Sequence, residues 1–383
     1  MGFFSFSLLK DPFVYLSNKI EPNKKYYCKD ITLWKELNNR NKNQNFCFLK
    51  HEKRLKISSI EKSLLFCLPP NFGLGDAVEY SIAINSLIKS NKFLEIGIAF
   101  CNKYEFIFKE IFLFKNVYPL LISEDQIKMY ETIFHLTNEV KSLKYQKYKR
   151  SNLALEICKY FNVPLIDFKI SNYKKKENYK KIISIYPVST STIRSMPYSV
   201  LNKIVESLGQ QYKIKIVIDD SNYSKYLIGK NDNKKISIIK PKNIGSLIEE
   251  ISKIWCGIFI DSGPLHVAKI FNKKGFFIET SVGSDILLSN YKNIFTIKNI
   301  YKSNYCEGPC GLVDLFSYNG NVGCYETNKL SFEKIKSLDN FKSLQRWNKK
   351  DINPKFYFNP VGCVKKIRIK EIIEMIKKNI REN

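Results

Sequence analysis

Short apolar runs alternate along this chain with stretches in which apolar residues recur at helical spacing. The runs are bounded by polar or glycine-bearing loops, a pattern that predicts buried strands, and the spaced stretches predict helices with one buried face. The expected strands are Leu64–Leu68, Glu95–Phe100, Ile182–Tyr186, Lys215–Ile218, Gly257–Ile260 and Phe276–Glu279. This alternation predicts an α/β protein with parallel sheets, and 383 residues are enough for two domains.

The same pattern predicts helices and a division of the chain. A helix is expected at Tyr198–Leu208, which Gly209 would stop, and another at Ile244–Lys253. One face of a last helix carries Ile369, Ile372, Ile373, Ile376 and Ile380, as in a helix that covers a core. A lysine-rich stretch of low apolar content separates two strand–helix series. We therefore expect an N-terminal extension at 1–63, a first domain at 64–173, a linker at 174–181, a second domain at 182–362 and a final helical segment at 363–383.

One expected strand ends in a tight turn that is suited to an anion. The apolar run Gly257–Ile260 leads into Asp261-Ser262-Gly263, and Pro264 then occupies a position that the first turn of a helix favours for proline. Backbone N–H groups at a helix start are unpaired, and the helix dipole places partial positive charge there. The turn is therefore either a phosphate site or an ordinary strand–turn–helix connection.

A second strand, Leu64–Leu68, runs into a loop that contains Gly73 and Gly75, and Asp76 follows where a helix would begin. An aspartate in that place most often accepts a backbone N–H as a helix cap. It can equally be a carboxylate at the rim of a cleft that takes a proton from a substrate. Both interpretations of Asp76 stay open from the residues alone.

The ten cysteines fall into two groups. Six are scattered and are expected as small core residues: Cys28, Cys47, Cys67, Cys101, Cys158 and Cys256. The other four gather in the C-terminal third, in polar sequence with glycine and proline: Cys306, Cys310, Cys324 and Cys363. Four thiolates can hold zinc or iron tetrahedrally, but this spacing is wider than that of a paired Cys-x-x-Cys. A structural metal site and free thiols are the two interpretations.

The formal net charge of +27 comes mostly from lysines that are spread along the chain, whereas arginine occupies only seven positions. Without arginine-rich clusters or a recognised module, we do not expect specific nucleic-acid binding. Exposed lysines contribute on the order of 1 kcal/mol each near an anionic leaflet, so an anionic membrane surface is a candidate partner. The apolar run Phe3–Leu9 is too short to span a membrane and lacks a basic start. We therefore expect a cytoplasmic protein or one held peripherally on the inner face of the cytoplasmic membrane.

Three motifs together resemble glycosyltransferase family 9, the bacterial heptosyltransferase-like enzymes of cell-surface glycan assembly. Gly75-Asp76 is similar to the Gly-Asp near the N-terminus of that family. The loop Pro187–Pro197 is similar to a family loop that runs from Pro-Gly-Ala-Ser to Lys-Arg-Trp-Pro, and Asp261–His266 is similar to its Asp-Ser/Thr-Gly-x-x-His turn. The cysteine-bearing segment 303–325 also resembles one that many members carry.

The resemblance implies the GT-B fold, in which two Rossmann-like domains with parallel sheets face each other across a cleft and the last helix crosses back to the first domain. It implies a nucleotide-diphosphate sugar donor, for which we expect ADP-heptose, and an acceptor on a surface glycan, a lipid-linked glycan or a lipopolysaccharide. Transfer is expected to invert the anomeric centre and to need no cofactor for catalysis. The alternatives are a protein O-heptosyltransferase and a non-catalytic, basic surface-binding protein that kept the fold.

The resemblance also assigns roles to residues. Asp76 would be the base that accepts the proton of the acceptor hydroxyl, and Asp261 would contact the donor sugar or else hold its own turn. The residues expected at the donor diphosphate are Ser189, Thr190, Ser191, Arg194, Ser262, Gly263, Pro264, Leu265 and His266.

The chain departs from the family pattern in two places. Arg194 stands where the family generally has lysine, and arginine keeps the charge while adding a planar fork for phosphate. Ser195-Met196 replace its Arg-Trp, and Asp219-Asp220 replace glycines, which weakens any transfer of nucleobase specificity.

Overall fold

The structure is a computed structural model, and its chain divides into two compact units, Met1–Phe168 and Lys169–Asn383. The residues that it describes are 3–8, 13–15, 18–22, 24–28, 46–52, 62–69, 72–100, 102–136, 152–170, 181–219, 236–288, 291–304, 306–312, 315, 323–329 and 356–381. The division between the units falls just before the lysine-rich stretch in which we expected the linker, most of which lies outside the described residues.

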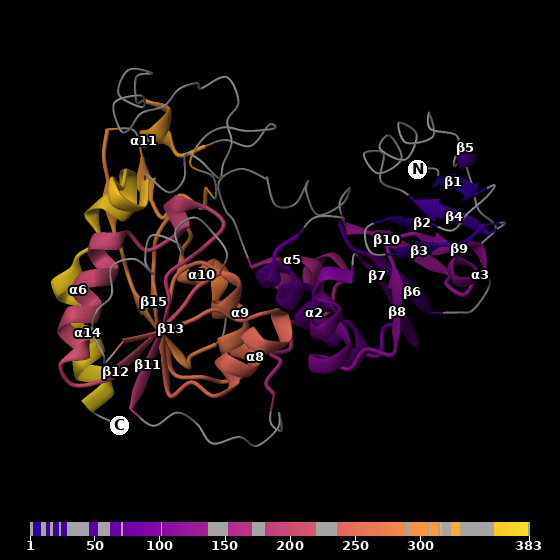
Figure 1. The fold of residues 1–383 in the computed structure, drawn as a ribbon. Coiled ribbons are helices and arrows are strands. Elements are labelled where there is room, and N and C mark those ends of the chain that lie inside the picture. Colours follow the sequence, from indigo (N-terminus) through magenta and orange to yellow (C-terminus); the bar gives the residue numbers. More distant parts are fainter. Residues whose placement is uncertain are drawn as a thin grey trace. The chain divides into compact units, whose positions relative to one another are not determined.

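The first unit contains a parallel sheet with the strand order β10-β6-β7-β8 (Figure 1). Its strands are β6 (Ser63–Cys67), β7 (Glu95–Phe100), β8 (Asn116–Pro119) and β10 (Thr132–His135). Every residue of β6 is buried, as its unbroken apolar run predicts for a strand that is covered on both faces. Helix α2 (Leu74–Lys89) connects β6 to β7 and packs against α5 (Leu153–Tyr160). The described residues of this unit also form the helical turns η1 (Asn102–Tyr104), η2 (Ile107–Ile111) and α3 (Glu124–Ile127).

The N-terminal segment forms an antiparallel sheet with the order β5-β1-β4-β9. Its strands are β1 (Phe3–Leu8), β4 (Lys25–Cys28), β5 (Phe46–Glu52) and β9 (Ile122–Ser123), while β2 (Phe13–Tyr15) pairs with β3 (Asn18–Ile20). Because β9 follows β8 in the chain, this sheet joins the segment expected as an extension to the first unit. Tyr27 reinforces the connection, since its hydroxyl donates to Glu124 Oε2 at 3.0 Å.

The second unit contains a six-stranded parallel sheet with the order β13-β12-β11-β14-β15-β16. Its strands are β11 (Ile182–Tyr186), β12 (Lys213–Val217), β13 (Ile236–Ile239), β14 (Cys256–Phe259), β15 (Gly275–Ile278) and β16 (Ile294–Ile297). All six strands that the sequence predicted for the two units are present, with ends that agree to within two residues. Numbered in chain order, the strands lie in the sequence 3-2-1-4-5-6, which is the order of a dinucleotide-binding fold. All strands are parallel, and the strand order reverses between β11 and β14.

Close packing between β14 and β15 depends on a pair of glycines. Gly257 and Gly275 lie opposite each other in the ladder. A Cβ atom on Gly275 would lie 2.7 Å from the Gly257 carbonyl oxygen, and one on Gly257 would overlap the ring of Phe259. Glycine at both positions therefore leaves room for this ring and lets the two strands approach.

Helices of the second unit cover a large apolar core. Among the described residues they are α6 (Tyr198–Gly209), α8 (Ile244–Ser252), α9 (Gly263–Ile270), α10 (Ser284–Leu287), α11 (Tyr325–Asn328) and α14 (Ile369–Arg381), with the helical turns η3 (Thr192–Arg194) and η4 (Gly362–Lys366). The final helix α14 lies beside α6 and buries Ile372, Ile376 and Ile380 in this core. Each such side chain stabilises the fold by about 1.5–3 kcal/mol. The expected return of this helix to the first unit stays a prediction.

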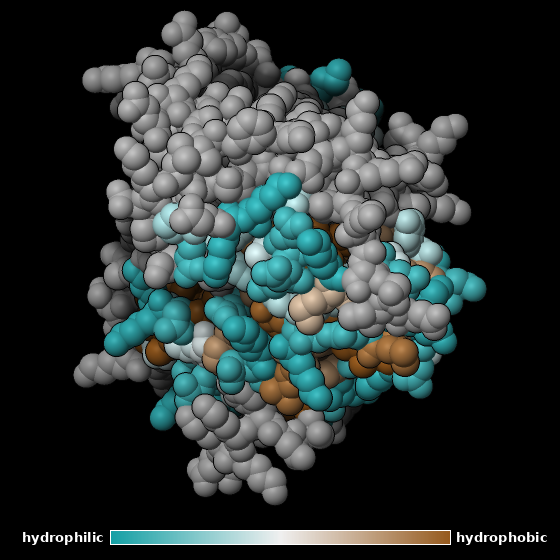
Figure 2. Space-filling view, turned by 90° about the vertical axis from the view of Figure 1, so that its right-hand side faces the viewer, coloured by the Kyte–Doolittle hydropathy of each residue, from teal (hydrophilic) through white to brown (hydrophobic). Residues whose placement is uncertain are grey.

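On the face that Figure 2 shows, hydrophilic side chains of the described residues surround small groups of hydrophobic ones. Large apolar side chains that stay exposed include Leu94, Leu113 and Ile300. In the part of the chain that the structure describes, no helix has both the length and the apolar character required to cross a membrane.

Candidate functional site

The carboxyl ends of β11 and β14 lie side by side at the reversal point of the second sheet. Tyr186 and Phe259, the last residues of these strands, are paired in the ladder, and their rings stack with centroids 5.1 Å apart. The loops that follow both strands therefore start from the same place. In open α/β sheets, ligands bind outside the carboxyl ends of the strands at such a point.

The loop after β11 is closed by Ser195. Its hydroxyl accepts the Ser189 N–H at 2.9 Å and donates to the Ser191 carbonyl oxygen at 2.8 Å. Met196, whose N–H donates to the Pro187 carbonyl oxygen at 2.9 Å, is fully buried in the core. Ser195-Met196, a departure from the family pattern, thus shape this loop. Sequence reasoning did not assign Ser195, although a serine inside a tight loop is a general signal for such local bonding.

Tyr357 supports the same loop from the C-terminal part of the chain. It lies in the core, where burial raises the pKa of its hydroxyl to about 12. A side-chain hydrogen bond with Ser195 opposes that shift, and the negative charge of Asp219 adds to it. Tyr357 therefore lies close to Ser195 and to the carboxylate that follows β12. Sequence reasoning gave no signal for this contact.

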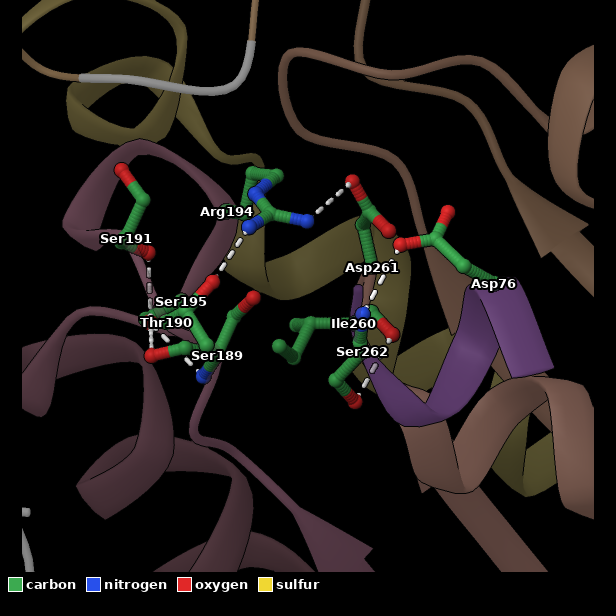
Figure 3. A network of polar contacts seen from close by, with 10 residues as sticks. Asp76, Ser189, Thr190, Ser191, Arg194, Ser195, Ile260, Asp261 and Ser262 are labelled. Carbon is green, nitrogen blue, oxygen red and sulfur yellow. Dashed lines mark hydrogen bonds and ion pairs between the residues drawn. The ribbon is translucent and has the colours of Figure 1, made fainter. Parts of the chain in front are cut away.

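Arg194 connects the two loops (Figure 3). One of its terminal nitrogens, Nη2, donates to Thr190 Oγ1 at 2.5 Å, and Nη1 lies 3.4 Å from Asp261 Oδ2. The Arg194 side chain is 18% exposed and that of Asp261 is 7% exposed. The structure thus brings together three of the predicted site residues, from the ends of two neighbouring strands. The buried Nε of Arg194 makes no hydrogen bond within the described chain, so the guanidinium retains a donor for a ligand.

The loop after β14 forms the expected helix start. Ser262 is the N-cap of α9 with extended backbone, Gly263 is the first helical residue, and Pro264 follows it. Eight helical residues direct the positive end of their dipole to this point. His266 is buried in the first turn.

Leu265 offers little polar chemistry to a ligand in this turn. Its side chain is fully buried, and its N–H already donates to the Ser262 carbonyl oxygen at 3.1 Å. Any diphosphate contact from Leu265 stays a prediction.

Asp76 lies in the first unit, where it caps helix α2 from the third helical position. The N-cap residue is Gly73, and its N–H donates to Asp76 Oδ2 at 2.9 Å. The structure therefore shows the capping contact, while the role of general base stays a prediction. One turn further along, burial and then the charge of Asp76 raise the pKa of Tyr80 well above its ordinary value.

The four C-terminal cysteines gather around a short hairpin of β17 (Tyr301–Lys302) and β18 (Glu307–Gly308). Burial raises the pKa of Cys306 to about 12, and the neighbouring thiols of Cys310 and Cys324 add to the shift. Burial also raises the pKa of Cys363, followed by the effects of Cys310, Cys324 and Cys306. The four side chains therefore approach one another from three separated segments.

A metal ion held by this cluster stays a prediction. All four cysteines are free thiols, which are the soft ligands that zinc and iron accept. Within the described residues, however, no three side chains of His, Cys, Asp or Glu are arranged to hold one ion. Of the six scattered cysteines, the three whose side chains are described, Cys67, Cys158 and Cys256, are buried as expected, and Cys28, Cys47 and Cys101 lie outside that set.

Comparison with known proteins shows likeness in structure but not in sequence. No protein-family model matches the chain, and no curated protein matches it. The iron-containing dodecameric glycosyltransferase TibC from enterotoxigenic E. coli is 9% identical, with 99% of this chain and 92% of TibC covered and a TM-score of 0.51. TibC in complex with ADP-D-beta-D-heptose gives 10% identity, 100% and 92% coverage and a TM-score of 0.50.

The E. coli heptosyltransferase WaaC with ADP-2-deoxy-2-fluoro heptose is also similar. Its identity is 10%, the coverage is 62% of this chain and 93% of WaaC, and the TM-score is 0.45, so no conclusion rests on it. At such identities, likeness establishes the fold alone. The chain has the two-unit α/β fold of TibC, which confirms the GT-B class that the sequence motifs implied.

Proposed function

We propose that this protein is a glycosyltransferase of the family-9, heptosyltransferase-like kind, which takes its sugar from a nucleotide-diphosphate donor. The observation that carries the proposal is the position of Arg194 between Thr190 and Asp261, at the reversal point of the sheet and next to the start of α9. A guanidinium and a helix N-terminus at one strand edge form an anion site for a diphosphate. The three sequence motifs and the TibC-like fold support the same activity.

In the proposed reaction, the residues of the anion site stabilise the diphosphate as it leaves. Negative charge grows on the diphosphate as the bond between the sugar and the phosphate oxygen breaks. Donors from the two loops would therefore bind the transition state more tightly than the ground state. These donors come from Arg194, from the hydroxyls of Ser189, Thr190 and Ser191, and from Ser262, Gly263 and His266 in the first turn of α9. No metal ion takes part in this step.

The acceptor hydroxyl would attack the anomeric carbon directly, so that one displacement inverts its configuration. Asp76 would accept the proton of that hydroxyl through the carboxylate oxygen that does not cap Gly73. Asp261 is assigned a contact with the donor sugar in addition to its pairing with Arg194.

The donor assigned to this chain is ADP-heptose, a proposal supported by the likeness to the TibC complex with that nucleotide sugar. The acceptor is a surface glycan of the lipopolysaccharide type, and the excess of lysines would hold the enzyme at an anionic membrane surface. A protein hydroxyl is the second candidate acceptor. It is favoured by the extra N-terminal sheet, which adds surface to the first unit.

The cysteine cluster is assigned a structural iron or zinc ion. Its support is the approach of four thiols from separated segments, together with the iron content of TibC. An ion bound by Cys306, Cys310, Cys324 and Cys363 would hold the hairpin and the C-terminal segment together.

The first test is binding of nucleotides by thermal shift. The panel is ADP, GDP, UDP and dTDP with their monophosphates, followed by transfer assays with ADP-heptose. A ligand at 100 times its Kd adds about 2.7 kcal/mol to stability, which raises the melting temperature visibly. Stabilisation by ADP alone is the expected result. No response to any nucleotide would refute the transferase and favour a surface-binding protein that has lost the chemistry.

A further inference from the structure

A third strand end contributes to the edge at which β11 and β14 finish. The last ladder pair between β14 and β15 joins Phe259 to Phe277. Two residues further along, the chain reaches Asp261 after the end of β14 and Glu279 after the end of β15. The turn 279–284 therefore runs beside the loop that carries Asp261 and Ser262. Neither the motifs nor the proposed mechanism uses this turn.

The turn encloses two hydroxyl groups that lack partners. Thr280 is 0% exposed and Ser281 is 1% exposed. Thr280 Oγ1 and Ser281 Oγ are buried, and neither makes a hydrogen bond with the described part of the protein. A buried hydroxyl that stays unpaired is costly, and native structures rarely retain one without a water or ligand to satisfy it. Two neighbouring cases at a strand edge therefore require a partner from outside the protein, a water or a ligand.

The turn is held firmly from both sides. The Glu279 carboxylate accepts the Ser284 N–H at 2.8 Å and thereby closes the turn. The Ser281 carbonyl oxygen accepts the Gly311 N–H at 2.5 Å. A Cβ atom on Gly283 would lie 3.2 Å from Pro309 Cγ. The cysteine-bearing segment thus packs against the turn. The hydroxyls of Thr280 and Ser281 are therefore held in position before any ligand binds.

The strand order indicates which half of the donor lies here. With the diphosphate over β11 and β14, one end of the donor extends towards β12 and the other towards β15. Asp219 follows β12, the second strand of this order, and an acidic residue at that position binds ribose in dinucleotide folds. The nucleoside therefore lies on the β12 side, which leaves the sugar for the β15 side. Neutral hydroxyls are suitable partners for sugar hydroxyls.

We propose that Thr280 and Ser281 form a sugar-binding subsite of the donor site, with their hydroxyls bonded to the sugar half of the nucleotide sugar. The inference rests on the proposed function. It goes beyond that function because it assigns two residues that decide which sugar is accepted.

The test compares binding of ADP-heptose and of ADP by calorimetry for Thr280→Val and Ser281→Ala. Each substitution keeps the approximate volume and removes one hydroxyl. Loss of one hydrogen bond is expected to raise the Kd for ADP-heptose about fivefold and to leave the Kd for ADP unchanged. The melting temperature should not fall, because the hydroxyls have no partner in the described chain.

Ser184→Ala is the matched control. Ser184 is 0% exposed and its hydroxyl also lacks a partner among the described residues, but it lies in the middle of β11. This variant should bind both nucleotides normally. Unchanged ADP-heptose binding by Thr280→Val and Ser281→Ala would overturn the subsite, as would an equal loss of ADP binding. Failure of the unsubstituted protein to bind either nucleotide would overturn the proposed function and the subsite together.

Discussion

Arg194→Ala is the substitution that tests the donor site most directly. It removes the only side chain that contacts both Thr190 and Asp261 among the described residues. The guanidinium would make at least one charge-assisted hydrogen bond to the diphosphate, and its removal should weaken ADP binding by about 1.5–3 kcal/mol. That loss corresponds to a rise in Kd of about 10- to 150-fold. The buried carboxylate of Asp261 would also lose its cation and repel the diphosphate, which places the expected loss towards the upper end.

The assay is titration calorimetry with ADP, accompanied by a thermal melt of each protein. Arg368→Ala is the control, because Arg368 also pairs with a carboxylate, Glu371, at 3.1 Å but is 66% exposed. Exposed pairs contribute about 0–1 kcal/mol, so this variant should melt and bind ADP almost like the unsubstituted protein. Arg194→Lys should recover part of the affinity because it restores the charge without the fork.

Equal ADP affinity in Arg194→Ala and in the unsubstituted protein, with both folded, would refute the assignment. That result would move the diphosphate away from the reversal point of the sheet. Equal, weakened affinity in Arg194→Lys and Arg194→Ala would instead show that the planar fork of arginine, and not its charge alone, binds the diphosphate.

Three further predictions concern catalysis, the metal and the core. Asp76→Asn should lower the transfer rate by about 10²–10⁴-fold with ADP binding intact, since an amide can still cap Gly73 but cannot take a proton; unchanged turnover would exclude Asp76 as the base. Metal analysis of protein purified without a His tag should find near-stoichiometric iron or zinc, and Cys310→Ser should lower it; a metal-free preparation would refute the metal site. Ile376→Ala, at a fully buried position of α14, should lower the free energy of unfolding by about 2–5 kcal/mol. The exposed neighbour Met375→Ala should change it by at most about 0.5 kcal/mol in denaturant melts.

Individual strands and helices of this fold could be predicted from the sequence, because each depends on residues that are close together in the chain. The buried strand β6 is an unbroken apolar run, and α9 begins where Gly263-Pro264 predicts a helix start. The final helix shows its buried face in the spacing of its isoleucines. The residues at the ends of β11 and β14 could likewise be named, because loops that follow parallel strands collect at one edge of a sheet.

The sequence alone determined the six strands and the final helix expected from their apolar patterns, and the loops after β11 and β14 that carry polar residues. Only the tertiary structure decided which of these loops are neighbours. Arg194 and Asp261 are 67 positions apart and meet because β11 pairs with β14. Thr280 and Ser281 belong to no motif in the sequence. They became candidates for a binding subsite only because the structure buries their hydroxyls without partners in the turn that follows β15. Strand order depends on packing between distant parts of the chain, whereas hydrophobic periodicity and turn chemistry act only over a few residues. The sequence therefore allowed the local elements to be predicted but not the order of the strands.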